Sequence, residues 1–170
     1  MVTVGQPAAV EIRAFPDLLH AHQSMVFSIA YHFLRDRSTA EEIAQDVFLQ
    51  LFRNLPKIES ETHVVHWLRK ATSNRCIDFV RRRKMQVSIE DVAEPSVAAA
   101  AGDPLMSRML RRLIASLPEK PRMMMVLRYQ EDLMPEEIAA ILDMSVSTVK
   151  SHLQRALALM RAKIARQGEI

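Results

Sequence analysis

Apolar residues recur at helical spacing in two blocks of this chain, and a stretch of different composition separates the blocks. In residues 14–84 and 104–166 an apolar side chain recurs every three or four positions, and apolar and polar residues do not alternate as they would in a β-strand. Residues 85–103 carry four acidic side chains and no Lys or Arg, so they have little power to form a core. With only three glycines in the chain, we expect an all-α fold of two small helical domains joined by a flexible linker.

Helix starts can be predicted within the first block. Ser38 to Glu41 has the spacing of a capping box, which predicts a helix that begins after Ser38. Phe52 belongs to the apolar stripe expected on the inner side of this helix. Thr62 is expected to cap a third helix that reaches about Lys84 and carries seven of its eight charges as Lys or Arg.

Near the end of the chain, residues 135–161 have the layout of a helix-turn-helix. Pro135 suits a first helical position, Asp143 to Ser145 gives a three-residue turn, and Ser145 can cap the next helix. The outer face of that last helix carries cations and hydrogen-bond donors that could reach base edges and phosphates in a major groove. These residues are Ser147, Thr148, Lys150, Ser151, His152, Gln154 and Arg155.

The residues of this motif resemble a known family. Glu137 to Leu142, followed by Ser145 and the run 148–156, resembles the promoter-binding C-terminal domain of sigma factors. Ser147 stands where that family often has Gly, and His152 where it often has Arg. Both differences would alter promoter preference, and the second weakens a phosphate contact.

The first block resembles the other conserved domain of the same family. Ala40 to Phe48 is similar to the helix that docks on the clamp of RNA polymerase. Trp67, Asn74 and the run 81–83 are similar to the helix that engages the −10 element. The order of the two domains, with only a linker between them, resembles the extracytoplasmic-function group of the sigma-70 family. The resemblance implies a domain similar to sigma region 2 over residues 14–84, a linker over 85–103 and a helix-turn-helix domain similar to sigma region 4 over 104–166.

The resemblance implies two further surfaces in the first block. The residues implied to face the polymerase clamp lie outside the buried stripe and are Gln45, Asp46, Leu49, Gln50 and Arg53. Asn74 is similar to the residue that helps to hold a flipped base of the nontemplate strand, in a pocket that the preceding loop could shape. Nearby cations would bind the phosphates of the DNA backbone. The residues implied to bind the −10 element are therefore Lys57, Ser60, His63, Lys70, Asn74, Arg75, Arg81 and Arg82.

The partners implied by the resemblance are core RNA polymerase, promoter DNA and an anti-sigma protein. The DNA would be bound as duplex at the −35 element and as a melted nontemplate strand at the −10 element. A net charge of +3 permits a polyanionic partner. We expect a cytoplasmic protein without membrane insertion, because no run approaches the roughly 18 apolar residues of a membrane span.

No catalytic set stands out, so we expect a protein that is not an enzyme and needs no cofactor. Glycine-rich phosphate loops and nucleophile elbows are missing from the sequence. His63 and His66 have a spacing that can bind metal and, with Cys76, could suggest a sensor. We expect no metal site, because structural zinc wants four ligands and no fourth is placed.

Two other interpretations stay open at this point. The chain could be a sigma mimic that titrates an anti-sigma factor without starting transcription, although both cationic helices are retained. It could also be an ordinary helix-turn-helix repressor or activator, which would leave the resemblance of the first block unexplained.

Overall fold

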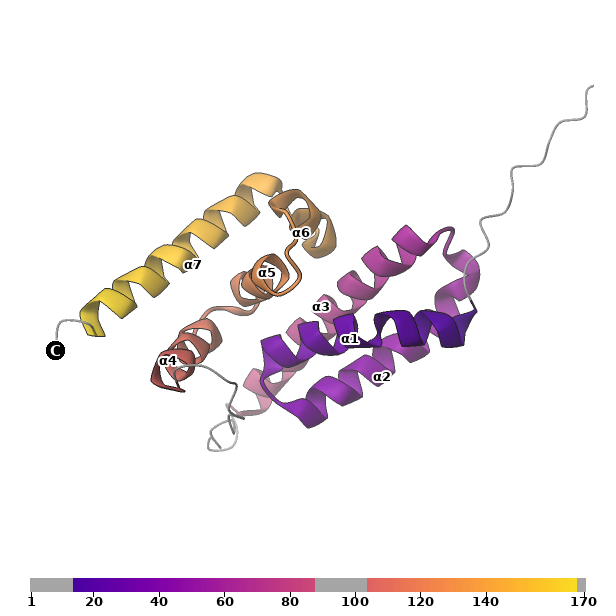
Figure 1. The fold of residues 1–170 in the computed structure, drawn as a ribbon, viewed down its shortest axis with the longest axis horizontal. Helices are drawn as coiled ribbons and strands as arrows, with labels where there is room; N and C mark the ends of the chain where they lie inside the picture. The colour runs from indigo at the N-terminus through magenta and orange to yellow at the C-terminus, as the bar shows by residue number, and fades with distance from the viewer. Residues whose placement is uncertain (1–13, 88–103, 168–170) are drawn as a thin grey trace, which may run out of the picture.

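The computed structural model of the protein describes residues 14–87 and 104–167, and its regular secondary structure there is helical (Figure 1). This confirms the all-α prediction. Of the linker expected over 85–103, residues 85–87 belong to the third long helix, and residues 88–103 lie outside the described part. The elements are α1 (Phe15–Leu34), α2 (Arg37–Asn54), the short 3-10 helix η1 (Leu55–Lys57), α3 (Glu61–Val87), α4 (Pro104–Ala115), α5 (Glu119–Tyr129), α6 (Pro135–Leu142) and α7 (Val146–Gln167).

Helices α1, α2 and α3 pack against one another and form the N-terminal half. Their facing stripes are fully or almost fully buried, as expected from the spacing of the apolar residues. From α1 the buried side chains include Leu18, Val26, Ile29 and Phe33, from α2 Ile43, Val47, Phe48 and Leu51, and from α3 Val64, Leu68, Cys76 and Ile77.

The predicted caps of α2 and α3 are each wrong by two residues. The carboxylate of Asp36 accepts a hydrogen bond from the Ser38 N–H at 3.0 Å, so α2 begins at Arg37. The Ser60 hydroxyl accepts one from the His63 N–H at 3.1 Å, so α3 begins at Glu61. In both cases a capping side chain stands earlier than the predicted one and satisfies a free N–H of the first turn.

The place predicted for Phe52 is also wrong. Its side chain is 61% exposed instead of buried, and its ring meets that of Phe15 edge-on, with centroids 5.2 Å apart. Phe52 therefore belongs to the outer side of α2, next to Leu49, which is 56% exposed.

Helices α6 and α7 form the expected helix-turn-helix. Asp143 follows α6 in the left-handed conformation, with φ of 51°, which Asp tolerates better than most residues. The Ser145 hydroxyl accepts a hydrogen bond from the Thr148 N–H at 3.2 Å and caps α7. At the start of α6, Glu137 accepts one from the Met134 N–H at 2.8 Å. The left-handed Asp143 and the Ser145 cap thus fix the two ends of the turn, and the Glu137 bond fixes the start of α6.

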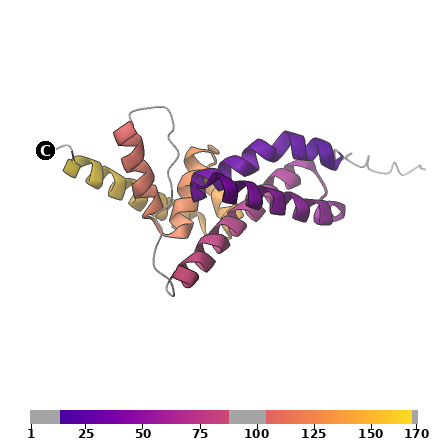
Figure 2. The same ribbon diagram turned by 90° about the horizontal axis from the view of Figure 1, so that it is seen from below.

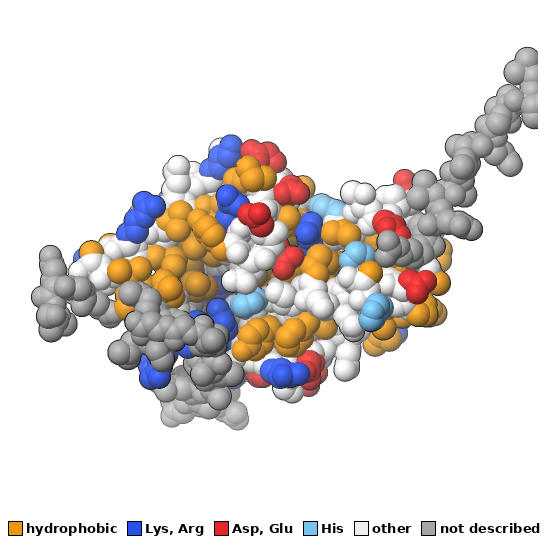
Figure 3. All heavy atoms as spheres, viewed as in Figure 1, with side chains coloured by type: hydrophobic (Ala, Val, Ile, Leu, Met, Phe, Trp, Pro, Cys, Tyr) orange, Lys and Arg blue, Asp and Glu red, His pale blue; other side chains and the backbone are white. Residues whose placement is uncertain are grey.

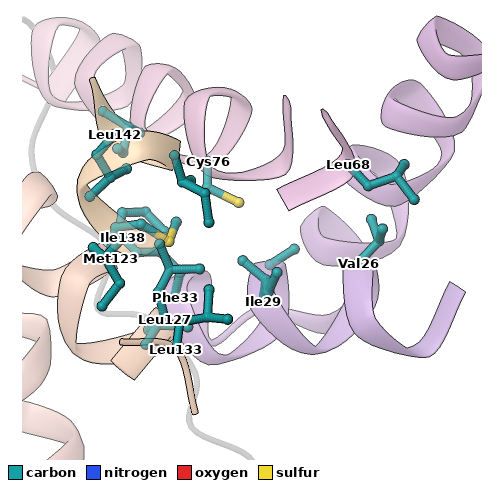
Figure 4. Close-up of a cluster of buried hydrophobic side chains, with 14 of the residues drawn as sticks. Val26, Ile29, Phe33, Leu68, Cys76, Met123, Leu127, Leu133, Ile138 and Leu142 are labelled. Carbon is teal, nitrogen blue, oxygen red and sulfur yellow. The ribbon is translucent and has the colours of Figure 1, made fainter. Parts of the chain in front are cut away.

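The two halves of the molecule pack together. Helix α5 contacts both α1 and α3, and α6 contacts α3 (Figures 1 and 2). Phe33 of α1 lies beside Met123 and Leu127 of α5 and near Ile138 of α6 (Figure 4). The sequence left the distance between the halves open, and the structure joins them through one continuous apolar core.

Candidate nucleic-acid and polymerase interfaces

Helix α7 has a polar outer face and an apolar inner face. Val149, Leu153 and Ala156 are buried against the rest of the C-terminal half and hold the helix in place. Of the predicted DNA-binding residues, Ser147, Lys150, Gln154 and Arg155 are exposed, and Thr148, Ser151 and His152 are half-buried. The seven residues therefore share one side of the helix, as the helical spacing predicts.

Several polar groups at the start of α7 already have partners. The Lys150 ammonium lies 3.2 Å from a carboxylate oxygen of Glu136 on α6. A backbone hydrogen bond at the helix start, and then the bond from Lys150, lower the pKa of Glu136. The Ser145 and Thr148 hydroxyl oxygens are 2.6 Å apart. Glu136 thus sets the position of the Lys150 ammonium, next to the acidic side chains gathered over α6 (Figure 3).

Helix α3 carries the predicted −10 residues on its solvent side. Asn74, Arg81 and Arg82 are exposed, whereas Leu68 and Thr72 are buried on the opposite side. Exposed cations next to an exposed amide can bind both phosphates and a base edge. This part of the predicted site is open to a nucleic acid strand.

The predicted loop residues lie at the beginning of α3, away from Asn74. Lys57 ends η1, Ser60 caps α3, and the His63 imidazole accepts a hydrogen bond from the Glu59 N–H at 3.5 Å. At about 1.5 Å of rise per residue, His63 is roughly 16 Å from Asn74 along the helix. The two groups share one face of α3, but they lie too far apart along it to touch the same base or neighbouring phosphates.

Two of the predicted phosphate-binding cations are held by acidic side chains. The Lys70 ammonium lies 2.9 Å from the Asp143 carboxylate in the turn of the helix-turn-helix. The Arg75 guanidinium lies 3.4 Å from Asp46 on α2. With its amide oxygen turned to Arg75, Gln50 also accepts hydrogen bonds of 3.2 Å from Nε and 3.0 Å from Nη2. Both cations are therefore paired with carboxylates, and no local spacing in the sequence indicates these contacts.

The residues implied to bind polymerase lie on the outer side of α2. Gln45, Asp46, Leu49 and Arg53 are exposed, and Gln50 is half-buried. Phe52 extends this surface, and the three-residue spacing between Leu49 and Phe52 was the sequence signal for it. A pocket of about 640 Å³ adjoins Leu49 and is lined by apolar side chains of α1 and α2, including Phe15, Leu19, Phe27 and Phe48. Together these groups offer a partner an apolar contact rimmed by polar side chains.

A second pocket, of about 650 Å³, lies where α1, α3 and α6 meet, and its lining includes His22, His66, Arg69, Glu136 and Glu137. Within residues 14–87 and 104–167, no group of three His, Cys, Asp or Glu side chains is placed to hold a metal ion. Cys76 lies in the core, and burial raises the pKa of its thiol to about 12. In the same described ranges, the helices are too short or too polar to cross a bilayer.

Comparison with protein families matches both halves of the chain. Residues 18–85 match Sigma-70 region 2, and residues 107–160 match Sigma-70, region 4. The first match contains α2 and nearly all of α3, and the second contains α6 and α7 up to Met160. The two matches together cover well over half of the chain.

Relatives of known type extend over most of the chain. The probable RNA polymerase sigma factor RfaY of Xanthomonas campestris pv. campestris is 28% identical over 163 residues, which is 89% of this chain and 40% of RfaY. The ECF RNA polymerase sigma factor SigW of Bacillus subtilis is 25% identical over 168 residues, which is 89% of each chain.

A solved structure shares the fold across both halves. The sigma factor RpoE from Bartonella quintana, crystallised with the anti-sigma factor NepR, superposes with a TM-score of 0.75 at 20% identity. The likeness covers 91% of this chain and 98% of RpoE. The two family matches, their order on one chain and these relatives show that the protein belongs to the sigma-70 family, as a sigma factor of the extracytoplasmic-function group.

Proposed function

We propose that this sigma factor binds core RNA polymerase and directs it to promoters by recognising a −10 and a −35 element. The observation that carries the proposal is the pair of outward-facing polar helices, α3 and α7, on one chain that also exposes an apolar patch on α2. A regulator that only binds duplex DNA would need the outer face of α7 alone.

The N-terminal half would make the contact with polymerase and with the melted strand. Leu49 and Phe52 are large apolar side chains left open to solvent, and such side chains are typical anchors of protein interfaces. On α3, Asn74 would hold an extruded base while Arg81 and Arg82 bind the strand's phosphates.

The C-terminal half would read the −35 element as duplex. Val149 and Leu153 fix α7 from behind, so its outer face can enter a major groove as one rigid surface. Lys150 and Arg155 would contact phosphates or guanine edges, and Gln154 could pair with adenine. In this role the chain catalyses no reaction itself, because RNA polymerase would catalyse RNA synthesis.

An anti-sigma protein is the regulatory partner that we propose. RpoE, which shares the fold over both halves, is crystallised with the anti-sigma factor NepR. In this chain, an anti-sigma protein that covered both the pocket beside Leu49 and the outer face of α3 would block the binding of polymerase and of DNA.

Two experiments with the full chain test the proposed function. Co-sedimentation with core RNA polymerase is expected, and run-off transcription from a pool of duplexes with randomised upstream sequence should yield transcripts that share two sequence elements. A chain that binds polymerase or an anti-sigma factor but gives no transcript from the pool would favour the sigma mimic. Duplex binding without any polymerase binding would favour an ordinary regulator.

A further inference from the structure

The pocket where α1, α3 and α6 meet has no part in the proposed function. No lining residue that the structure describes is among those proposed to bind DNA or polymerase. Its volume of about 650 Å³ lies in the range of roughly 300 to 1,000 Å³ that is typical of sites for small molecules. Val65 of α3 and Ala140 and Ile141 of α6 give it an apolar side. Figure 3 shows basic, acidic and histidine side chains close together where α6 lies next to α3.

Three hydrogen-bond donors of α3 line this pocket. Thr62, His66 and Arg69 are spaced by four and then three residues, so they follow one another along one face of the helix. The Arg69 Nε is buried, and within residues 14–87 and 104–167 it has no hydrogen-bond partner. In the same ranges the side chains of Thr62 and His66 make no hydrogen bond or ion pair. A buried donor without an acceptor is unfavourable, so an anion placed against Arg69 would be stabilised.

The acidic residues of the lining limit the charge that the pocket can accept. Glu136 lies 3.2 Å from the Lys150 ammonium, and Glu137 accepts a hydrogen bond from the Met134 N–H at 2.8 Å. Glu61 is a third carboxylate in the lining. These negative charges disfavour a dianion such as a phosphate monoester. A carboxylate, with a single charge and a planar pair of oxygens, suits one guanidinium better.

A further carboxylate lies near Arg69. Glu131, in the segment between α5 and α6, is half-buried, and burial raises its pKa while the charge of Arg69 lowers it. In the part of the chain that the structure describes, the two side chains form no direct ion pair. Glu131 therefore balances the charge of Arg69 only in part, and it would compete with a bound anion.

We infer that this pocket binds a small carboxylic acid with an apolar body. The Arg69 guanidinium would bind the carboxylate through two parallel hydrogen bonds, and the Thr62 hydroxyl and the His66 imidazole would donate to the remaining lone pairs. Val65 and Ile141 would cover the apolar body. The site goes beyond the proposed function, and its test uses the full chain without polymerase or DNA.

Four probes separate the contribution of charge from that of apolar contact. Hexanoate carries a carboxylate and an apolar chain, hexanamide lacks the charge, acetate lacks the chain, and hexylammonium has the opposite charge. Ligand-observed NMR titrations of the full chain at constant ionic strength measure the binding of each probe. For a ligand of about eight non-hydrogen atoms we expect a dissociation constant of roughly 1 mM for hexanoate, and binding about tenfold weaker or more for the other three.

Variants of the lining locate the bound probe. Arg69→Gln removes the guanidinium and should weaken hexanoate binding by roughly tenfold, because a charged hydrogen bond is lost. Arg83→Gln removes the same charge at an exposed position of the same helix and should bind like the wild type. Ala140→Leu keeps the three donors but fills the apolar side, so it should also weaken binding. Ala140 is exposed, so the larger side chain is compatible with folding.

Glu131→Gln should change the affinity in the opposite direction. Hexanoate binding should become roughly two- to threefold tighter, because a competing negative charge near Arg69 is removed. A structural role of these residues alone would not strengthen binding. Urea denaturation of each variant shows whether a loss of binding reflects unfolding. If Arg69→Gln does not fold, the opposite effects expected of Ala140→Leu and Glu131→Gln still decide.

Three results would overturn the carboxylate site. The first is a wild-type chain that binds none of the carboxylates. The second is equal hexanoate binding by Arg69→Gln and Arg83→Gln, or by Ala140→Leu and Glu131→Gln. The third is tighter binding of hexylammonium than of hexanoate, which would mean that the acidic side chains of the lining decide the choice of ligand.

Discussion

The Arg75 guanidinium and the Asp46 carboxylate, 3.4 Å apart, join α3, which carries the proposed DNA-binding residues, to α2, which carries the proposed polymerase-binding surface. Arg75 lies on α3 and was expected to bind phosphate, whereas Asp46 lies on α2 and was expected to contact the clamp. A partner that engages Asp46 would therefore change the environment of a DNA-binding cation on the neighbouring helix.

Removing either partner should affect function more than folding. The two side chains are 36% and 53% exposed, so we expect Arg75→Ala and Asp46→Ala each to change the free energy of unfolding by less than about 1 kcal/mol. Urea denaturation of the two variants and the double variant measures this. A loss of several kcal/mol in either variant would make the pair a structural element instead of a link between two binding surfaces.

Lys150 and Glu136 should have opposite effects on duplex binding. Lys150→Ala should lower the affinity for a −35 duplex and reduce the slope of its salt dependence by about one, since one phosphate contact is lost. Glu136→Gln should raise the affinity at low salt, because Lys150 no longer has to leave a carboxylate 3.2 Å away. Fluorescence anisotropy over a salt series checks both, and weaker binding by Glu136→Gln would contradict the competition.

Asn74→Ala should impair opening of the −10 element without affecting stability. The side chain is exposed, so its loss removes no packing. If Asn74 holds an extruded base, the variant should lose less transcription activity on a template with a pre-melted −10 region than on a closed duplex. On both templates it should lose its preference for the identity of that base. Permanganate reactivity and run-off transcription on both templates measure this. Equal activity of variant and wild type on the closed duplex would exclude the assigned role.

Leu49→Glu should reduce binding to core polymerase by tenfold or more. The Leu49 side chain is 56% exposed, so a charged replacement costs little free energy of folding. Binding to polymerase would, however, bury the new carboxylate unpaired in an apolar interface, which is unfavourable. Leu159→Glu, at 54% exposure on α7, is the matched control for the same change outside α2. Surface plasmon resonance with immobilised core enzyme compares them, and an equal loss in both variants would argue against a specific α2 surface.

Stability should fall as the pH drops below 6.5 because of His32. Burial, and then the charge of Arg35, lower the pKa of this imidazole in the folded chain from its ordinary value of 6.5. The unfolded chain therefore takes up the proton first, and the free energy of unfolding decreases until the pH has passed the folded pKa. His32→Gln should flatten this part of the pH profile in urea titrations, and an unchanged slope would rule out His32 as its cause.

The sequence predicted the helices and the helix-turn-helix well because both depend on local signals. Apolar spacing located Leu18, Val26 and Phe33 in the core, and Pro135 and Ser145 marked helix starts that the structure confirms. The caps of α2 and α3 were misjudged because several neighbouring polar residues compete for one N-cap position.

Relations between distant residues could not be predicted from the same signals. Spacing marks which side chains of α3 are polar, but it cannot show that Lys70 faces Asp143 or that Arg75 faces Asp46. Phe52 fits the apolar stripe of α2 by helical spacing, one turn after Phe48, and only the way α1 and α3 pack on α2 decides that it faces outward. The contact between the halves depends on such long-range packing, so it came from the structure alone.

The most direct test of the central claim, that α3 and α7 read two separate promoter elements, is to sequence transcripts made by variants of each helix from one randomised duplex pool. We predict that Arg155→Ala relaxes the upstream element and leaves the downstream element as in the wild type, and that Asn74→Ala does the reverse. If both variants select the same two elements as the wild-type chain, or if either variant alters both elements together, the assignment of one helix to each element is contradicted.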